Sequence, residues 1–164
     1  MSLAEAILTE LKAVGVRWLT WLPDSETKAM YSLIADDPDL RLVQVCREDE
    51  AVGVCYGLLK GGARAAVMIQ NTGMMNAVDA IRGIPLRMQQ PMLLLVGYRG
   101  YEGMVRQAAN VDTAAIYTEP LLQALKIPYY LVHSAEDAGK IGAASREAEQ
   151  TSGPAVVLIT REYE

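Results

Sequence analysis

Three carboxylates follow one another directly after a short apolar run, at Glu48, Asp49 and Glu50. The run ends at Cys46 and a helical pattern extends from Glu48 to Lys60, so the acids stand where a predicted strand meets a predicted helix. In parallel α/β proteins, ligands bind outside the carboxyl ends of the strands, where such junctions lie. Acids in a first helical turn also interact favourably with the helix dipole. The pattern therefore predicts either a ligand-binding junction or an ordinary N-terminal charge cluster.

Polar residues also follow other predicted strands. Asp24 and Ser25 lie between a strand and a helix, and Asn71 and Thr72 lie in a predicted loop before another helix. Each pair can act as a helix cap or turn, or can contribute to a binding site at the same edge of the sheet. Arg99 stands in a glycine-bearing loop, where a guanidinium can clamp an anionic group or form a salt bridge at a subunit contact.

The composition restricts the classes of partner. The chain has 164 residues, 51% of them hydrophobic, which is enough for one domain with a sizeable core. Its formal net charge is -5 and its charges are scattered, so we expect no nucleic-acid partner. The longest apolar runs, such as residues 91–96, are too short to cross a membrane, and the N-terminus lacks the basic segment of a signal peptide. We therefore expect a cytoplasmic protein without a membrane partner.

The cysteines and the histidine do not predict a metal site. Cys46 and Cys55 lack the spacing of zinc ligands, and His133 is the only histidine in the sequence. We interpret both cysteines as reduced thiols and His133, between a strand and a helix, as structural. The sequence also has no Walker-type phosphate loop and no dinucleotide-binding fingerprint. Function has to be argued from the acids and the polar junctions.

Strands and helices alternate along the chain. Apolar runs predict strands at residues 16–22, 42–46, 65–69, 91–96, 128–132 and 155–160. Helices are expected from a capping box at Ser2 and Glu5 to residue 14, and at residues 25–33, 48–60, 74–84, 118–125 and 134–150, with loops at 70–73 and 97–103. This alternation predicts an α/β fold: a single three-layer α/β/α domain over residues 1–164, with a parallel sheet of about six strands.

Four short motifs occur in order along the chain. They are Leu22-Pro23-Asp24-Ser25 with Lys28, Arg47-Glu48-Asp49-Glu50-Ala51-Val52-Gly53 with Gly57, Gln70-Asn71-Thr72-Gly73 with Asn76-Ala77, and Pro91-Met92-Leu93-Leu94-Leu95-Val96-Gly97 with Arg99-Gly100 and Gly103. Together they resemble the pyrimidine-binding (PYR) domain of thiamine diphosphate-dependent 2-oxo acid decarboxylases, especially the sulfopyruvate decarboxylase α subunit and phosphonopyruvate decarboxylase. The resemblance covers nearly the whole chain and implies the thiamine diphosphate-binding fold.

The resemblance also implies roles for individual residues. Glu48 lies nine residues before Gly57 and matches the glutamate that hydrogen-bonds N1′ of the cofactor's aminopyrimidine, whereas Glu50 does not fit that spacing. The implied cofactor contacts are Glu48, Pro23, Asn71, Thr72 and Gly73. The implied substrate contacts are Asp24, Ser25, Asn71 and Arg99. The implied activity is decarboxylation of a 2-oxo acid, with sulfopyruvate as the expected substrate and phosphonopyruvate as the alternative.

The sequence departs from the family pattern in two places. Met74-Met75 stands where similar proteins have a small or apolar residue and then glycine, so we expect a more crowded loop beside the cofactor. The family binds the diphosphate through Mg2+ with a G-D-G motif, which this sequence does not contain. The resemblance thus implies a separate β-type subunit that carries the diphosphate and Mg2+ site, in an assembly that also associates copies of this fold. A non-catalytic regulatory subunit and a flavodoxin-like module for another small ligand are the alternative interpretations.

Overall fold

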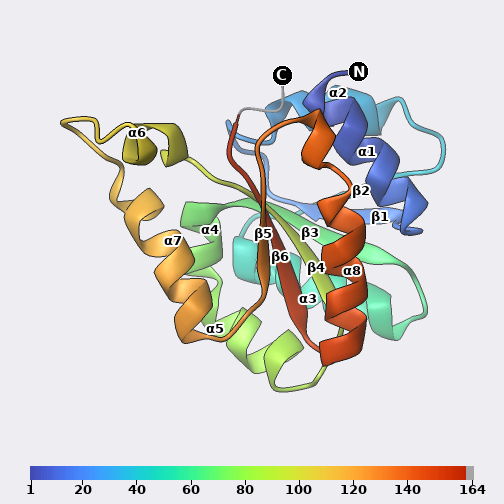
Figure 1. Cartoon of the computed structure of the whole chain (residues 1–164). Coiled ribbons are helices and arrows are strands. Elements are labelled where there is room, and N and C mark those ends of the chain that lie inside the picture. The colour runs from blue at the N-terminus through green and yellow to red at the C-terminus, as the bar shows by residue number, and fades with distance from the viewer. Residues whose placement is uncertain (162–164) are drawn as a thin grey trace.

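One sheet of six parallel strands forms the centre of the computed structural model, which describes residues 1–161 (Figure 1). The strands are β1 (Trp18–Trp21), β2 (Arg41–Gln44), β3 (Ala65–Gln70), β4 (Met92–Gly97), β5 (Tyr129–Val132) and β6 (Pro154–Ile159). Their order across the sheet is β2-β1-β3-β4-β6-β5. The expected fold class, a three-layer α/β/α arrangement around about six parallel strands, is confirmed.

Helices cover both faces of the sheet. They are α1 (Leu3–Ala13), α2 (Lys28–Ala35), α3 (Glu48–Lys60), α4 (Asn71–Asn76), α5 (Val78–Ile81), the π-helical turn η1 (Arg82–Leu86), α6 (Tyr101–Val105), α7 (Thr113–Ala124), the 3-10 turn η2 (Ala135–Asp137) and α8 (Lys140–Thr151). Figure 1 shows α1 and α8 on one side of the sheet and α4, α5 and α7 on the other. Among residues 1–161, none of these helices has the length and apolar character that a membrane span requires.

Two separate cores explain why the central strands are apolar along their whole length. In β3, Ala66 and Met68 pack with residues of α1, α2 and α8, whereas Val67 and Ile69 pack with residues of α3, α5 and α7. Successive side chains of a strand point to opposite faces, so a strand covered on both faces must be apolar at nearly every position. The continuous apolar runs of the sequence reflect this two-sided burial.

Two predicted helix starts are confirmed. The Ser2 hydroxyl accepts the Glu5 N–H at 3.2 Å, and the Glu5 carboxylate accepts the Ser2 N–H at 2.8 Å, which is the reciprocal pair of a capping box. α3 spans Glu48–Lys60 as expected, with three acids in its first turn and Lys60 in its last. Both sets of charges complement the helix dipole.

The segment after β3 differs from the expected loop and long helix. α4 begins at Asn71 without an intervening loop, because the backbone passes from an extended conformation at Gln70 directly into the helix. The helix expected to reach residue 84 is divided into α4, α5 and η1. Pro85 lies inside η1, and a proline cannot donate the amide hydrogen that a regular α-helix needs at that position.

The segment after β4 also differs. The loop expected at residues 97–103 contains the start of α6, and α7 begins at residue 113 rather than 118. Asp112 caps α7, because its carboxylate accepts the Ala114 N–H at 3.0 Å. The expected start near residue 118 was wrong, because the Asp112 cap starts the helix at Thr113 and Pro120 lies in its interior.

Two other helix starts are later than expected. A turn at residues 25–27 precedes α2, which begins at Lys28. Residues 135–137 form the separate turn η2, and Ser134 makes no side-chain capping bond, so α8 begins only at Lys140. In both places the polar residues that the sequence pattern assigns to the first turn of a helix form a separate turn before the helix begins.

The strand order creates a switch point between β1 and β3. After β1 the chain continues to β2 at the edge of the sheet, and it then returns past β1 to β3 on the other side. Because all the strands are parallel, their carboxyl ends lie along one side of the sheet. The connections that follow β1, β2 and β3 therefore all leave the sheet on that side. Ligands of open α/β sheets bind at such a point.

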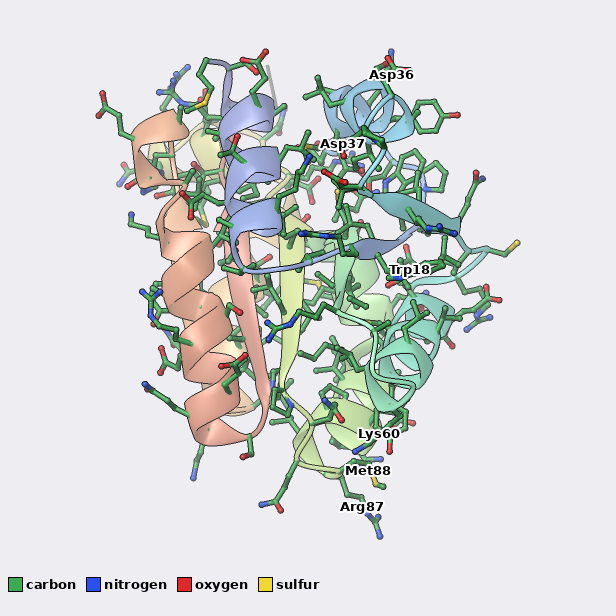
Figure 2. All side chains as sticks on the ribbon, turned by 90° about the vertical axis from the view of Figure 1, so that its right-hand side faces the viewer. Trp18, Asp36, Asp37, Lys60, Arg87 and Met88 are labelled. Carbon is green, nitrogen blue, oxygen red and sulfur yellow. The ribbon has the colours of Figure 1, made fainter. Side chains whose placement is uncertain are left out.

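Replacing Leu94 by alanine should strongly destabilise the fold. Leu94 lies in β4 and is 0% exposed, so the substitution leaves a cavity and should reduce the free energy of unfolding by about 2–5 kcal/mol. Met88, which is 53% exposed and lies at an end of the molecule (Figure 2), provides the control, because Met88→Ala should change it by no more than about 0.5 kcal/mol. Urea unfolding measures both. Equal losses would contradict the position of β4 in the core.

Candidate functional site

Glu48 lies at the switch point, in the first turn of α3, and its side chain contacts α4. Its Oε2 accepts a hydrogen bond from Asn76 Nδ2 at 3.0 Å. A Cβ atom at Gly73 would lie 2.4 Å from Glu48 Cγ and 2.6 Å from Oε1, which is shorter than any real contact. Glycine is therefore required at position 73 to let the carboxylate occupy this place. The predicted cofactor residues Glu48 and Gly73 are brought into contact by the fold.

The two neighbouring acids have other partners. Glu50 Oε2 accepts the Cys46 N–H at 2.9 Å, which satisfies the backbone at the start of α3. Asp49 forms an ion pair with Arg47 at 2.9 Å, and this guanidinium lowers the pKa of Asp49. Of the three acids, Glu48 is thus the one that reaches the next helix, whereas Asp49 and Glu50 act within the start of their own helix.

Asp24 presents one satisfied and one unsatisfied oxygen. Its Oδ1 accepts the Thr27 N–H at 2.8 Å, as in a helix-capping turn. Its Oδ2 is buried and has no hydrogen-bond partner among residues 1–161. Burial, with a smaller contribution from the negative charge of Glu48, raises the pKa of Asp24. Two predicted site residues therefore interact electrostatically across this edge of the sheet.

Gln70 is a site residue that the sequence interpretation did not select. It is the last residue of β3, and its Oε1 is the other buried side-chain atom in residues 1–161 that lacks a hydrogen-bond partner. Its only signal in the sequence is that it precedes Asn71 in the third motif. Unsatisfied buried oxygens are costly, so their presence at the ends of β1 and β3 indicates a place where a ligand donor fits.

Asn71 links three segments of the chain by hydrogen bonds of its side chain. The residue is fully buried, and its Nδ2 donates to the Arg99 carbonyl at 3.1 Å and to the Thr118 hydroxyl at 3.0 Å. Its Oδ1 accepts the Thr72 N–H at 3.1 Å. These bonds join the start of α4 to the loop after β4 and to α7. Contact of Asn71 or Thr72 with a cofactor or substrate stays a prediction.

The remaining predicted residues lie on the surface around this edge. Pro23 and Ser25 are exposed in the turn after β1. Arg99 is exposed, and its Nε forms an ion pair with Asp112 at 3.1 Å, so its guanidinium already has one carboxylate partner. Met74 is buried in the core beside α3. Its side chain therefore points away from the solvent-facing surface of α4.

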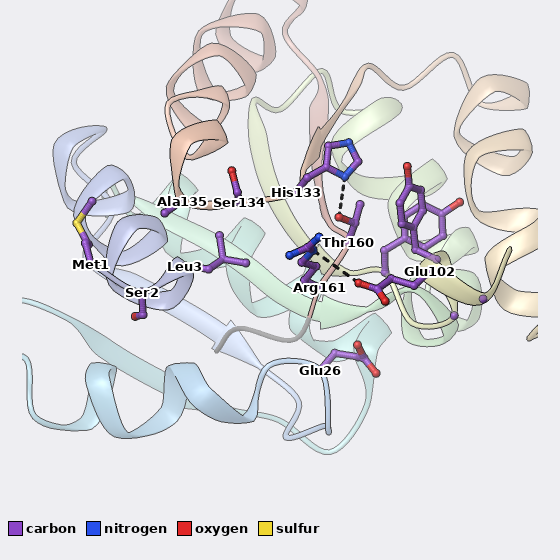
Figure 3. Close-up of a pocket in the computed structure, with 14 residues that line it drawn as sticks. Met1, Ser2, Leu3, Glu26, Glu102, His133, Ser134, Ala135, Thr160 and Arg161 are labelled. Carbon is purple, nitrogen blue, oxygen red and sulfur yellow. Dashed lines mark hydrogen bonds and ion pairs between the residues drawn. The ribbon is translucent and has the colours of Figure 1, made fainter. Parts of the chain in front are cut away.

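A hollow lies at the carboxyl ends of β4, β5 and β6, away from the residues described above. It is a cavity of about 690 Å³ whose wall includes Glu26, Glu102, His133 and Arg161. Figure 3 shows His133 beside Thr160, at 2.9 Å between Nδ1 and Oγ1, and Glu102 facing Arg161. Neither Asp24 nor Glu48 lines it. Among residues 1–161, no group of three or more histidine, cysteine or acidic side chains is placed to hold a metal ion.

Comparison with known proteins identifies the family. Residues 1–116 match the family described as thiamine pyrophosphate enzyme, N-terminal TPP binding domain. The chain belongs to this family. It is also 29% identical over 164 residues to the sulfopyruvate decarboxylase subunit alpha of Methanococcus maripaludis, covering 99% of this chain and 97% of the relative. The corresponding subunit of Methanocaldococcus jannaschii is 30% identical, covering 96% of this chain and 93% of that relative.

A longer relative has the same region as part of a larger chain. The sulfopyruvate decarboxylase of Methanosarcina acetivorans is 24% identical over 159 residues, which cover 95% of this chain but only 39% of that relative. The region that matches this chain is thus less than half of that relative.

The residues at the switch point fit the thiamine diphosphate of this family. The resemblance implies a carboxylate beside ring nitrogen N1′ of the aminopyrimidine. Glu48 supplies a partly exposed carboxylate, and Gly73 supplies a position without a Cβ directly beside it. The unpaired oxygens of Asp24 and Gln70 offer acceptors for ligand donors at the same edge.

Gly73→Ala should displace Glu48 and destabilise the protein. The added methyl group overlaps the Glu48 side chain, which has to rotate away and lose its hydrogen bond to Asn76, and this should cost about 0.5–1.5 kcal/mol in the free energy of unfolding. Gly53→Ala in α3 is the matched control, because its Cβ would meet no atom within 4 Å. Alanine there should stabilise the helix by about 0.5–1 kcal/mol. Thermal or urea unfolding would contradict the contact if both variants changed in the same direction.

Asp24→Asn should stabilise the protein at about pH 7, and the gain should vanish at low pH. Because the pKa of Asp24 is raised in the folded state, that state binds the proton more tightly than the unfolded state does. The carboxylate therefore costs stability above its folded pKa, and the cost disappears below its unfolded pKa of about 4. Asparagine keeps an acceptor for the Thr27 N–H.

Unfolding of wild type and Asp24→Asn across this pH range measures the effect. The exposed Asp36 at the end of α2 (Figure 2) gives the control variant Asp36→Asn, which makes the same chemical change outside this site. A loss of stability in Asp24→Asn at neutral pH would contradict the environment described for Oδ2.

Proposed function

We propose that this chain is the α-type subunit of a thiamine diphosphate-dependent decarboxylase that converts 3-sulfopyruvate to sulfoacetaldehyde and CO2. The observation that carries the proposal is the Glu48 carboxylate, held against Gly73 and Asn76 at the switch point of a thiamine pyrophosphate enzyme domain. The names of the relatives from Methanococcus maripaludis and Methanocaldococcus jannaschii support the choice of substrate.

Glu48 binds the pyrimidine ring in this proposal. Asn76 fixes Oε2 of the carboxylate, so Glu48 has a defined direction and would share a proton with ring nitrogen N1′ of the bound cofactor. Pro23, Thr72 and Gly73 line the ring, and Asn71 holds the start of α4 in place. Bound thiamine diphosphate supplies the electron sink for the electron pair released when CO2 leaves.

The substrate lies on the Asp24 side of the ring. Asp24 holds a proton at Oδ2 more readily than an exposed carboxyl group does, because burial and the charge of Glu48 raise its pKa. Ser25 stands beside it in the turn and contributes a hydroxyl. Arg99 attracts the sulfonate, since a guanidinium has five N–H donors and Asp112 approaches it at Nε.

A partner subunit completes the enzyme. The names of two relatives describe an alpha subunit, and the Methanosarcina acetivorans relative combines the corresponding region with a longer segment. The sequence has no G-D-G motif for Mg2+ and diphosphate. We therefore assign the diphosphate and Mg2+ site to a β-type subunit that docks at the switch point, in an assembly with several copies of this fold. The free cysteines Cys46 and Cys55 suit the reducing cytoplasm.

Glu48→Gln should abolish decarboxylation by the complex. The amide keeps the size of the side chain but removes the carboxylate that binds N1′, and the rate should fall by at least about 100-fold. The test is CO2 release from sulfopyruvate, phosphonopyruvate and pyruvate by this chain co-expressed with the β-type subunit, with thiamine diphosphate and Mg2+. Glu50→Gln is the control, because Glu50 acts only at the start of its own helix.

The substrate that releases CO2 identifies the activity. Release from sulfopyruvate that needs both chains and is lost in Glu48→Gln supports the proposal. Preference for phosphonopyruvate would reassign the substrate within the same chemistry. No release from any of the three acids, although the complex forms, would refute the decarboxylase and favour a non-catalytic binding subunit.

A further inference from the structure

A closed ring of hydrogen bonds joins the start of α4, the segment after β4 and the first turns of α7. Asn71 Nδ2 donates to the Arg99 carbonyl at 3.1 Å and to the Thr118 hydroxyl at 3.0 Å. Thr118 Oγ1 donates in turn to the Ala114 carbonyl at 2.6 Å. The Ala114 N–H donates to Asp112 Oδ1 at 3.0 Å. Asp112 Oδ2 lies 3.1 Å from Arg99 Nε, and this ion pair closes the ring.

The orientation of the Asn71 amide follows from its partners. The single hydroxyl hydrogen of Thr118 is directed to the Ala114 carbonyl, so the hydroxyl oxygen accepts from Asn71. The second Nδ2 hydrogen is directed to the Arg99 carbonyl, which can only accept. Asn71 Oδ1 accepts the Thr72 N–H at 3.1 Å. Both hydrogens of the Asn71 amide are thus used inside the protein, and the residue is 0% exposed.

The segment that carries Arg99 is fixed at three places. Asn71 holds the backbone carbonyl of Arg99, and Asp112 holds Nε of its guanidinium. The next residue, Gly100, has a φ of +82°, and a Cβ atom there would lie 2.8 Å from Asp112 Cβ and 3.2 Å from Ala115 Cβ. Glycine at position 100 therefore lets this segment lie directly against α7.

Burial decreases along the ring from Asn71 towards Arg99. Asn71 and Thr118 are 0% exposed, whereas the side chains of Asp112 and Arg99 are 30% and 52% exposed. An exposed ion pair adds little stability to a fold. The packing of α4 against α7 does not need a cation at the exposed end of the ring. The connection to Arg99 is therefore better explained by the position that it gives to the guanidinium.

We infer that Asn71 is a positioning residue that acts on the substrate through Arg99 and thereby favours 2-oxo acids with an anionic tail. This inference rests on the proposed function, in which Arg99 attracts the sulfonate. Asn71 fixes the backbone from which the guanidinium extends, and its own amide hydrogens remain inside the protein. A guanidinium that is already held in place loses less conformational freedom when it binds an anion. Loss of the Asn71 amide should therefore weaken binding of the tail.

Asn71→Ala in the reconstituted complex tests this role by kinetics. With sulfopyruvate, or with phosphonopyruvate if the complex prefers it, KM should rise by about tenfold. The kcat should change by less than about twofold, because the bond that breaks does not involve the tail. A purely structural role would reduce the number of active complexes, which lowers kcat at an unchanged KM, and that result would overturn the inference.

A double-variant comparison shows whether Asn71 acts through Arg99. Arg99→Gln should raise KM by about tenfold or more, because it removes the cation that meets the tail. Adding Asn71→Ala to Arg99→Gln should raise KM by less than about a further twofold, since no guanidinium is left to position. If the two single effects multiply in the double variant, Asn71 acts independently of Arg99 and the inference is wrong.

Thr118→Val and Thr118→Ser cover the case in which Asn71→Ala does not fold. Valine keeps the shape of threonine but removes the hydroxyl that accepts from Asn71, whereas serine keeps this hydroxyl. Thr118→Val should raise KM in the same direction as Asn71→Ala, and Thr118→Ser should keep the wild-type KM. The same KM in both Thr118 variants would contradict the inference.

Hydrogen exchange at Arg99 Nε gives a readout that does not require turnover. In the full chain without partner, the Nε–H signal of Arg99 is assigned by its absence in Arg99→Gln. This hydrogen should exchange about threefold faster or more in Asn71→Ala than in wild type, because the ion pair with Asp112 is held less firmly. An unchanged exchange rate would refute the positioning role.

Failure of the inference differs from failure of the proposed function. A wild-type complex that decarboxylates none of the three acids refutes the proposed function, whatever the exchange rate at Arg99 shows. An active complex in which Asn71→Ala leaves KM unchanged refutes the inference alone.

Discussion

Burial of the sheet on both faces is the constraint on which the arrangement of the site depends. All six positions of β4 and of β6 are buried, as are five of the six in β3. Such strands cannot carry polar side chains along their length, because a buried polar group needs a hydrogen-bond partner. Polar side chains therefore gather where the strands end. The strand order places the ends of β1 and β3 side by side, so the polar groups of three connections meet at one edge.

At this edge most polar groups are used by the protein itself. Asn71 links three segments, Glu50 satisfies the start of α3, and Arg99 is paired with Asp112. Asp24 Oδ2 and Gln70 Oε1 are the exceptions in residues 1–161. Each unsatisfied buried group costs about 1–3 kcal/mol. Two such costs in one place are expected where a fold is adapted to a ligand rather than to its own stability.

The sequence predicted the fold class and α3 because they depend on local patterns. Continuous apolar runs reveal strands buried on both faces, and an acidic first turn marks the start of α3. The rest depends on contacts between distant residues. In the structure, Glu48 is distinguished from Glu50 by its contacts with Gly73 and Asn76, which lie 25 and 28 residues further along the chain. The bond of Asn71 to Thr118 spans 47 residues. Thr27 has the residue type of an ordinary helix cap, but its hydroxyl accepts the indole N–H of Trp21 instead, and this contact has no signal in the sequence.

The division of the proposed enzyme into subunits assigns different tasks to different chains. The environment of Asp24 is built within this chain, by the Thr27 N–H and by the close approach of the turn to Gly97. Burial already raises its pKa before any partner is bound. A subunit that docks at the switch point removes further water, and removal of water disfavours the charged carboxylate. Docking therefore favours the protonated form of Asp24 further, whereas in the proposed enzyme the diphosphate site belongs to the partner.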